Sequence, residues 1–129
     1  MGTRPMAVIL IDDDPHVRDL FRLVMDHYSL SAEIFDNSEA AIDYLRNHTA
    51  DVVVIDIVMP ELDGYELLDR IQKANLAPRC RFVATTAYYT NDTQSEVLAH
   101  GFNGYLPKPF SAQNLVPYLR TIVENQKPS

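Results

Sequence analysis

The stretch that decides the fold is VVVIDIVMPELDG, residues 52–64. It opens with four consecutive β-branched apolar residues, a run that predicts a strand buried on both faces of a parallel sheet. A carboxylate, Asp56, follows directly. Pro60 then disfavours helix, and Gly64 precedes apolar residues at helical spacing. One acid therefore lies where a core strand gives way to a loop, which is the edge where parallel α/β sheets bind ligands.

The rest of the chain repeats this order of strand, loop and helix. The patterns predict five strands, at Met6–Ile11, Ser31–Phe35, Val52–Ile55, Arg81–Thr85 and Gly104–Leu106. Five helices are predicted between and after them, from Pro15 to about Tyr28, from Ser38 past Leu45, from about Asp63 to Ala74, from Asn91 to Gly101, and from Ser111 onward. Strict alternation with right-handed crossovers predicts an α/β fold, a doubly wound five-stranded parallel sheet in the order 2-1-3-4-5, as a flavodoxin-like three-layer sandwich.

Helix starts are marked by capping residues. Asp14 is the expected N-cap of the first helix and Ser38 that of the second. Asn91 is expected to cap the fourth helix, with Gln94 at the capping-box position. Pro117 lies in the fifth helix, where an interior proline costs about 3 kcal/mol, so we expect a late start or a kink there.

Length and composition restrict the class of protein. A chain of 129 residues fits one domain, which we place at 6–126, with a leader at 1–5 and a tail at 127–129. The net charge of −7 argues against direct binding of nucleic acid, which needs Lys and Arg to neutralise phosphates. A single cysteine, Cys80, permits no disulfide within the chain. With neither a signal-peptide pattern nor an apolar run of membrane length, we expect a cytoplasmic domain.

Polar residues follow four of the five predicted strands at the point where each strand ends. Asp12 and Asp13 follow the first strand, Asp56 the third, Thr86 the fourth and Lys108 the fifth. Strands 1, 3, 4 and 5 are neighbours in the predicted order, so all these groups meet at one edge of the sheet. Singly, each has an ordinary explanation, such as helix capping or a solvated lysine. Their joint placement favours a functional site.

The chemistry that suits this set is phosphoryl transfer to a carboxylate. Clustered acids repel one another unless a cation or a proton intervenes, and a hard divalent ion with oxygen ligands, Mg²⁺, would resolve that repulsion. Lys108 supplies a second positive charge, and the hydroxyl of Thr86 can donate to a phosphoryl oxygen. Asp56, central in the row, is the natural nucleophile and would form an aspartyl-phosphate.

At this point the sequence resembles the receiver domain of two-component response regulators, in particular the chemotaxis regulators. The resemblance covers roughly residues 6–126 and rests on the motifs ILIDDDP, VVVIDIVMPELDG, TTA and GYLPKPF in this order. It implies a domain that accepts a phosphoryl group from a sensor histidine kinase or a phosphotransfer protein, with Mg²⁺ bound, and then changes conformation to control an output partner. It implies a signalling function in a phosphorelay rather than an enzyme.

The resemblance also implies a role for each matching residue. Asp56 would be phosphorylated, with Thr86 and Lys108 as its catalytic partners. The metal ligands would be Asp12, Asp13, Asp56 and the backbone carbonyl of Val58. Thr86 and Tyr105 would form the switch, Tyr105 turning inward from solvent, and the bond between Lys108 and Pro109 would be cis. The output surface would be the fourth helix, fifth strand and fifth helix, which could also form a homodimer; the downstream output partner stays unknown, and no membrane contact is expected.

Three rival functions remain to be distinguished. A phosphatase of the haloacid-dehalogenase type would use an aspartate nucleophile, but it needs a second aspartate at the position of Val58. A flavin-binding electron carrier on the same fold would have a phosphate-binding loop rich in Ser, Thr and Gly after its first strand, where this chain is acidic. A purely structural module would not require Asp12, Asp13, Asp56, Thr86 and Lys108 together.

Overall fold

The computed structural model describes residues 5–124, which alternate between strands and helices. The strands are β1 (Ala7–Ile11), β2 (Ser31–Phe35), β3 (Val52–Asp56), β4 (Arg81–Thr86) and β5 (Gly104–Pro107). The helices are α1 (Pro15–His27), α2 (Ser38–Leu45), α3 (Gly64–Lys73), α4 (Thr93–His100) and α5 (Ala112–Glu124). The predicted tail lies outside the described residues, as does most of the predicted leader.

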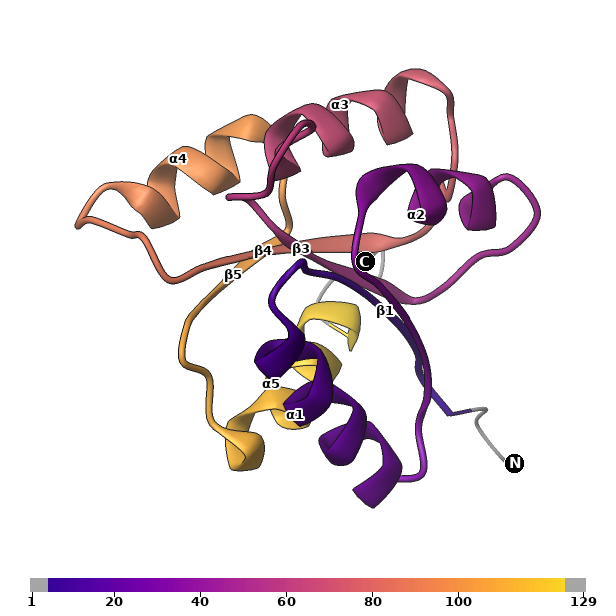
Figure 1. Ribbon diagram of the computed structural model, residues 1–129, viewed down its shortest axis with the longest axis vertical. Coiled ribbons are helices and arrows are strands. Elements are labelled where there is room, and N and C mark those ends of the chain that lie inside the picture. The colour runs from indigo at the N-terminus through magenta and orange to yellow at the C-terminus, as the bar shows by residue number, and fades with distance from the viewer. Residues whose placement is uncertain (1–4, 125–129) are drawn as a thin grey trace.

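The five strands form one parallel sheet in the order β2-β1-β3-β4-β5, which confirms the predicted doubly wound topology. Helices α2, α3 and α4 cover one face of this sheet and α1 and α5 cover the other (Figure 1). The first two connections therefore lead to opposite faces, and β1 and β3 lie side by side at the point where the winding reverses. Ligands of doubly wound sheets bind at this point, outside the carboxyl ends of the strands.

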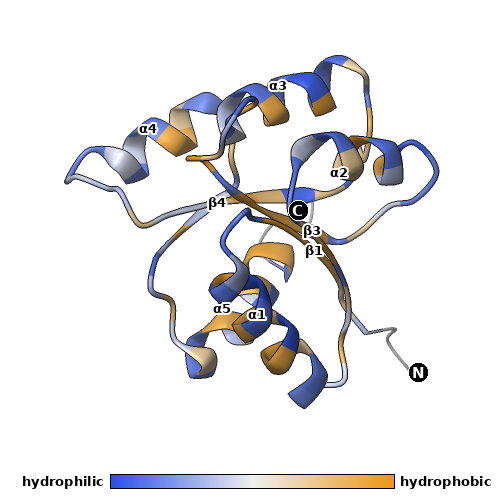
Figure 2. Cartoon of the chain, viewed as in Figure 1, coloured by the Kyte–Doolittle hydropathy of each residue, from blue (hydrophilic) through white to orange (hydrophobic). Residues whose placement is uncertain are grey.

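Alternate residues of the central strands supply two separate cores. Ile9 and Val53 point into the core under α2, α3 and α4, whereas Val8 and Val52 point into the core under α1 and α5. The strands β1 and β3 are accordingly apolar along their length (Figure 2). Because both faces of β3 are covered, each of its five residues is buried, Asp56 included. The continuous apolar run in the sequence is thus explained by burial on both sides.

Three strands, β3, β4 and β5, end one residue later than predicted, at the carboxyl edge of the sheet, and β1 begins one residue later than predicted. Strand β3 continues through Asp56, which pairs in register with Thr85 of β4. Strand β4 continues through Thr86, which pairs with Pro107 of β5. These polar residues are therefore held by ladder hydrogen bonds and belong to the rigid sheet, rather than to the loops that follow it.

Two of the predicted helix caps are wrong. The N-cap of α2 is Asn37, whose side chain accepts from the backbone N–H of Ala40, and Ser38 is the first helical residue. The N-cap of α4 is Asp92 rather than Asn91, and it makes no side-chain capping bond. Neighbouring residues of the same capping type compete for these positions, and the local sequence does not decide between them.

The remaining caps follow the expected chemistry. Asp14 accepts from the backbone N–H of His16 at 2.9 Å and caps α1, as predicted. Asp63 and Glu66 form a reciprocal capping box at the start of α3. This capping box fixes the backbone at the start of α3, directly after the loop that follows Asp56.

Proline at position 117 does not delay the start of α5, contrary to the expectation of a late start. The helix begins at Ala112, directly after Ser111, whose hydroxyl accepts from the backbone N–H of Gln113. Packing overrides the local cost of the proline, because Leu115, Val116 and Leu119 are fully buried against the sheet. None of the helices in residues 5–124 is long and apolar enough to cross a membrane.

Helix α3 approaches β3 closely at Gly64. A Cβ atom at this position would lie 2.7 Å from the carbonyl oxygen of Asp56 and 2.7 Å from the Cα of Ile57. Both are backbone atoms, so no rotamer change can relieve the overlap. Glycine is therefore required here for the helix to pack against the end of the strand that carries Asp56.

Gly64→Ala should lower the free energy of unfolding by about 1–3 kcal/mol, because the added methyl group forces α3 away from β3. Urea unfolding followed by circular dichroism measures the change. Gln94→Ala, on the exposed surface of α4, is the control and should leave stability nearly unchanged. A Gly64→Ala protein as stable as the parent would contradict the close packing described above.

Candidate functional site

Three carboxylates converge at the carboxyl edge of the sheet. Asp12 and Asp13 directly follow β1, and Asp56 ends the adjacent strand β3. One oxygen atom from each lies within 4.8 Å of the others. Asp12 is inaccessible and Asp56 is 4% exposed, whereas Asp13 is exposed. The cluster thus has two buried acids and one exposed acid. The sequence analysis predicted that these three acids meet at this edge of the sheet.

Backbone N–H groups orient the two buried acids. The N–H of Asp14 donates to Oδ1 of Asp12 at 2.9 Å, and the N–H of Val58 donates to Oδ1 of Asp56 at 3.0 Å. Each acid therefore has one oxygen engaged by its own loop. The other oxygen, Oδ2, is left for contacts across the site.

Lys108 provides those contacts. Its Nζ atom lies 2.8 Å from Oδ2 of Asp12 and 3.1 Å from Oδ2 of Asp56. It follows β5, and the peptide bond between Lys108 and Pro109 is cis. Burial lowers the Lys108 pKa, but the hydrogen bonds and charges of Asp12 and Asp56 raise it more, so that it lies above its ordinary value. The lysine is accordingly a fixed cation that joins the ends of three strands.

Burial dominates the electrostatics of Asp56. It raises the pKa of Asp56 from 3.8 to about 6, with the charge of Asp12 adding to the increase. The N–H of Val58 and the ammonium group of Lys108 act in the opposite direction and offset only part of it. A second cation near this group would favour its ionised form, because nearby positive charge stabilises a carboxylate.

The two adjacent threonines have different surroundings. The hydroxyl of Thr85 donates to the carbonyl of Leu106 at 2.6 Å and is committed to the contact between β4 and β5. The hydroxyl of Thr86 accepts from the N–H of Tyr88 at 3.0 Å, at the end of the strand. The backbone of Thr86 is fixed in the sheet, but its hydroxyl is bound only by the loop that follows, so the side chain can reorient.

The acids open into a cavity of about 550 Å³. Its walls come from the loops after β1, β3, β4 and β5, and its lining residues include Asp13, Asp56, Val58, Tyr88 and Lys108. Val58 is 49% exposed and Tyr88 is 77% exposed, so two bulky side chains flank an acidic interior. Of the predicted site residues, Asp13, Asp56, Val58 and Lys108 line this cavity, whereas Asp12, Thr86, Tyr105 and Pro109 do not.

Sequence reasoning missed one residue that supports the site. The guanidinium group of Arg18 donates to the backbone carbonyl of Asp12 at 3.0 Å and ties α1 to the loop that carries the acids. A signal was present, since Arg18 lies one helical turn beyond the cap of the helix that follows the acidic run. The signal is weak, because an arginine in the first turns of a helix is common and only the fold shows that Arg18 is half-buried against the loop after β1.

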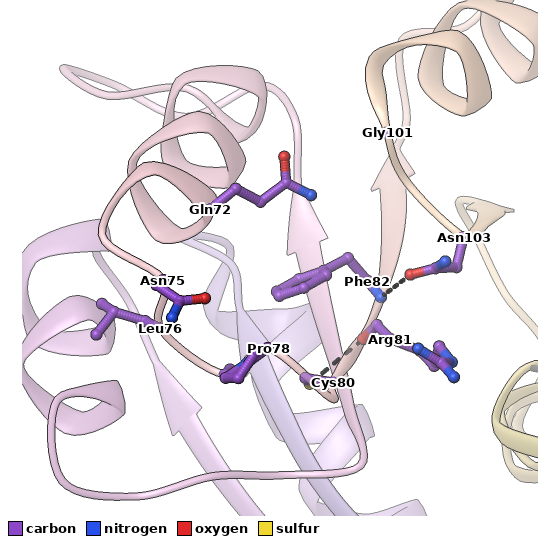
Figure 3. A pocket seen from close by; sticks show the side chains of 10 residues that line it. Gln72, Asn75, Leu76, Pro78, Cys80, Arg81, Phe82, Gly101 and Asn103 are labelled. Atoms are coloured by element: carbon purple, nitrogen blue, oxygen red, sulfur yellow. Dashed lines mark hydrogen bonds between the residues drawn. The ribbon is translucent and has the colours of Figure 1, made fainter.

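A second cavity, of about 310 Å³, lies at the opposite edge of the sheet (Figure 3). Its side chains come from the end of α3, the start of β4 and the loop before β5. Asn103 accepts from the N–H of Phe82 at 2.7 Å and so fastens that loop to β4. Burial raises the pKa of Cys80 to about 12, so its thiol is protonated and a poor nucleophile. Among the described residues, none that lines this cavity is acidic, so it lacks the carboxylate set of the carboxyl edge.

The donor set at the carboxyl edge fits a hard divalent cation. Three carboxylates face one ammonium group, which leaves an excess of negative charge in a largely buried place. Oxygen atoms are the ligands that such ions prefer, and the exposed carboxylate of Asp13 gives the ion a path of entry. The residues present can therefore hold a metal ion without rearrangement of the sheet.

Comparison with known proteins agrees with this geometry. The sequence pattern of the response regulator receiver domain matches residues 8–120. This chain belongs to the receiver domain family. A protein of Leptolyngbya boryana, described as an uncharacterized 14.6 kDa protein in the sodA1 3' region, is 32% identical over 111 residues, which cover 86% of this chain and 85% of that protein. The family confirms the predicted fold and the predicted class of function, a signalling phosphoacceptor that works with a histidine kinase and is not an enzyme of substrate turnover.

Two further relatives extend the comparison. The response regulator MprA of Mycobacterium sp. (strain KMS) is 28% identical over 124 residues, which are 96% of this chain but 53% of MprA. The receiver domain thus spans about half the length of several curated relatives. The receiver domain of the Francisella response regulator 1452 superposes with a TM-score of 0.83 at 25% identity, over 95% of this chain and 99% of that one.

The raised pKa of Asp56 predicts a pH-dependent stability. In metal-free buffer at about pH 8, Asp56→Asn should raise the free energy of unfolding by roughly 1–3 kcal/mol, because a buried carboxylate is replaced by a neutral amide. The folded protein binds the Asp56 proton more tightly than the unfolded chain does. The penalty is therefore relieved as the pH falls through about 6 toward 4, and the parent and the variant should converge.

Urea unfolding of both proteins across this pH range, with a chelator present, measures the difference. Asp36→Asn, an exposed acid of the loop after β2, is the matched control and should show no such trend. A stability difference between Asp56→Asn and the parent that stays constant with pH would contradict the raised pKa.

Proposed function

We propose that Asp56 of this receiver domain accepts the phosphoryl group from a phosphohistidine on a sensor histidine kinase or a phosphotransfer protein. The observation that carries the proposal is the position of its Oδ2 atom, 3.1 Å from Nζ of Lys108 at the base of the acidic cavity. A carboxylate oxygen would form the new bond to phosphorus as the bond from phosphorus to the histidine nitrogen breaks. The product is an aspartyl-phosphate and a free histidine.

Mg²⁺ is the metal that this proposal assigns to the acidic cluster. Asp12, Asp13 and Asp56 would supply carboxylate oxygens, and the backbone carbonyl of Val58 would complete the protein ligands. The ion, when bound, neutralises charge on the phosphoryl oxygens. The convergence of the three carboxylates within 4.8 Å supports this assignment.

Lys108 and Thr86 would receive the other phosphoryl oxygens. Lys108 is held between Asp12 and Asp56, so its ammonium group is oriented before a phosphoryl group arrives and needs little reorganisation. The hydroxyl of Thr86 would exchange its contact with the Tyr88 backbone for a hydrogen bond donated to phosphate.

The switch pair of this proposal is Thr86 and Tyr105, with one change from the sequence prediction. The hydroxyl oxygen of Tyr105 is already buried in this structure, and no hydrogen-bond partner is found for it within residues 5–124. Burial, with the charges of Tyr89 and Tyr65, raises the pKa of Tyr105. The expectation that the ring starts in solvent is therefore wrong here. Phosphorylation would act by stabilising this inward arrangement relative to an outward one.

The output surface in this proposal is the face of α4, β5 and α5. Curated relatives that extend beyond the matched region have room for an output domain, so the partner is either such a domain, a separate protein or a second copy bound through this face. With a net charge of −7, the domain itself is not expected to bind nucleic acid. The free, buried thiol of Cys80 supports a cytoplasmic location.

Asp56→Asn should abolish phosphorylation, because the amide is not a nucleophile at neutral pH. Incubation with acetyl phosphate and Mg²⁺, followed by intact-mass spectrometry, measures the adduct. Asp36→Asn, outside the site, is the control and should be phosphorylated like the parent. An undiminished phosphoryl adduct on Asp56→Asn would refute the assignment of the acceptor.

Asp13→Ala should weaken Mg²⁺ binding. Loss of a mere supporting contact costs roughly 10–100-fold in metal affinity, so loss of a direct ligand should cost at least that much. Amide chemical shifts at the ends of β1 and β3 during a Mg²⁺ titration measure the affinity. Asp14→Asn leaves the three converging carboxylates intact and is the control. Equal affinity in Asp13→Ala and the parent would remove Asp13 from the ligand set.

A further inference from the structure

A groove of about 370 Å³ lies between α2 and α3, away from the phosphoacceptor site. Its walls are formed by the exposed edges of these two helices, which lie on the same face of the sheet (Figure 1). Its lining residues are Glu39, Ile42, Arg46, Arg70, Lys73 and Ala74. None of them belongs to the acidic cluster, to its lysine or to the switch pair. The groove is therefore a separate surface feature.

Positive charge gathers at this groove although the chain is acidic. Three of its six lining residues are cations and one, Glu39, is an acid, in a protein with a net charge of −7. All three cations are exposed. The groove is thus locally positive on a chain that is negative as a whole, which distinguishes it from the acidic cavity at the carboxyl edge.

The acids of α3 are turned toward other partners. Glu66 accepts from the backbone N–H of Asp63 in the capping box, and Asp69 contacts His100 of α4 at 3.0 Å. Within residues 5–124, neither Arg70 nor Lys73 has a carboxylate within 4.0 Å. The charges of these two side chains are thus left facing solvent at the groove.

The third cation is only weakly paired. Arg46 lies 3.5 Å from Asp43, and the two side chains are 62% and 82% exposed. An exposed pair of this kind contributes little and exchanges readily for another carboxylate. Helix dipoles favour each cation separately, since Arg46 is the C-cap of α2 and Arg70 and Lys73 lie in the last turn of α3. What distinguishes the groove is that the ends of two different helices bring their cations to the same place.

Between the cations the floor of the groove is apolar. The two apolar lining residues are Ile42, which is 8% exposed, and the exposed Ala74 at the C-cap of α3. A partner segment that fits this surface has an apolar residue for the floor and carboxylates for the rim. Helix α2 has eight residues and is about 12 Å long, so about two turns of a partner helix would span the groove.

We propose that this groove docks an acidic amphipathic segment of a partner protein. Charge complementarity decides the class of partner, and the mode is that of a helix laid into a groove. A nucleic acid has phosphates along its whole length, so most of them would lie outside the reach of the three cations and would be repelled by the rest of the acidic chain. At physiological ionic strength the screening length is about 8 Å, so the acids elsewhere on the chain do not cancel the local attraction. The proposal does not depend on phosphorylation of Asp56.

The probe is a short capped peptide that forms an amphipathic helix, with leucines on one face and glutamates on the other. The same peptide with lysine in place of every glutamate is the control. Backbone amide shifts of the full chain are followed during titration at physiological salt. Binding of the glutamate peptide should shift amides of α2 and α3, and the lysine peptide should leave them unchanged. Arg70→Glu/Lys73→Glu should raise the dissociation constant about tenfold, since two attractions become repulsions.

Arg22→Glu/Arg120→Glu makes the same change of net charge on α1 and α5 and is the matched control; it should keep the parent's affinity. Glu39→Gln removes the one acid of the lining and should tighten binding, a result that no folding defect would imitate. The proposal is overturned if shifts fall outside α2 and α3, or if both double variants weaken binding equally. It is also overturned if a single-stranded oligonucleotide shifts the groove amides and the glutamate peptide does not, or if sedimentation shows the groove occupied by a second copy of the chain.

Discussion

The ion pairs of Lys108 with Asp12 and Asp56 are the constraint on which the site depends. Two buried carboxylates lie close together at the ends of neighbouring strands, and an ammonium group within 2.8 Å and 3.1 Å of them offsets their repulsion. The compensation is incomplete, because burial still raises the pKa of Asp56 to about 6. The protein therefore holds a charge arrangement that costs stability by itself and becomes more favourable when another cation binds.

The fold makes this arrangement rigid. Asp56 and Thr86 are the last residues of β3 and β4, so the ladder of the sheet fixes their backbones, and Gly64 allows α3 to pack against the same place. The acidic cavity is in turn built from the loops that follow four strands. The sheet therefore fixes the nucleophile, and the loops that follow the strands leave it accessible to a partner.

Charge is distributed unevenly over the rest of the molecule. The carboxyl edge of the sheet carries the acidic cluster, whereas the cations of α2 and α3 surround a groove with an apolar floor. A partner that brings a phosphoryl group and a partner that brings an acidic helix would thus meet different surfaces. Binding at one surface would leave the other accessible, because no residue lines both cavities.

The sequence by itself determined the sheet, its order and the set of residues at the carboxyl edge. Apolar runs on β1 and β3 require burial on both faces, and alternation with helices then leaves one topology in which Asp12, Asp56 and Lys108 meet. Only the tertiary structure decided which residue caps α2 and α4, how α5 tolerates Pro117, and that the Tyr105 hydroxyl is buried. The physical reason is one of scale. The free energy of burying an apolar strand is large, and the pattern that predicts it is local in sequence. Caps are decided by differences of about 1 kcal/mol between neighbouring residues of the same capping type, and a tolerated proline and a side-chain orientation depend on packing against residues distant in the chain.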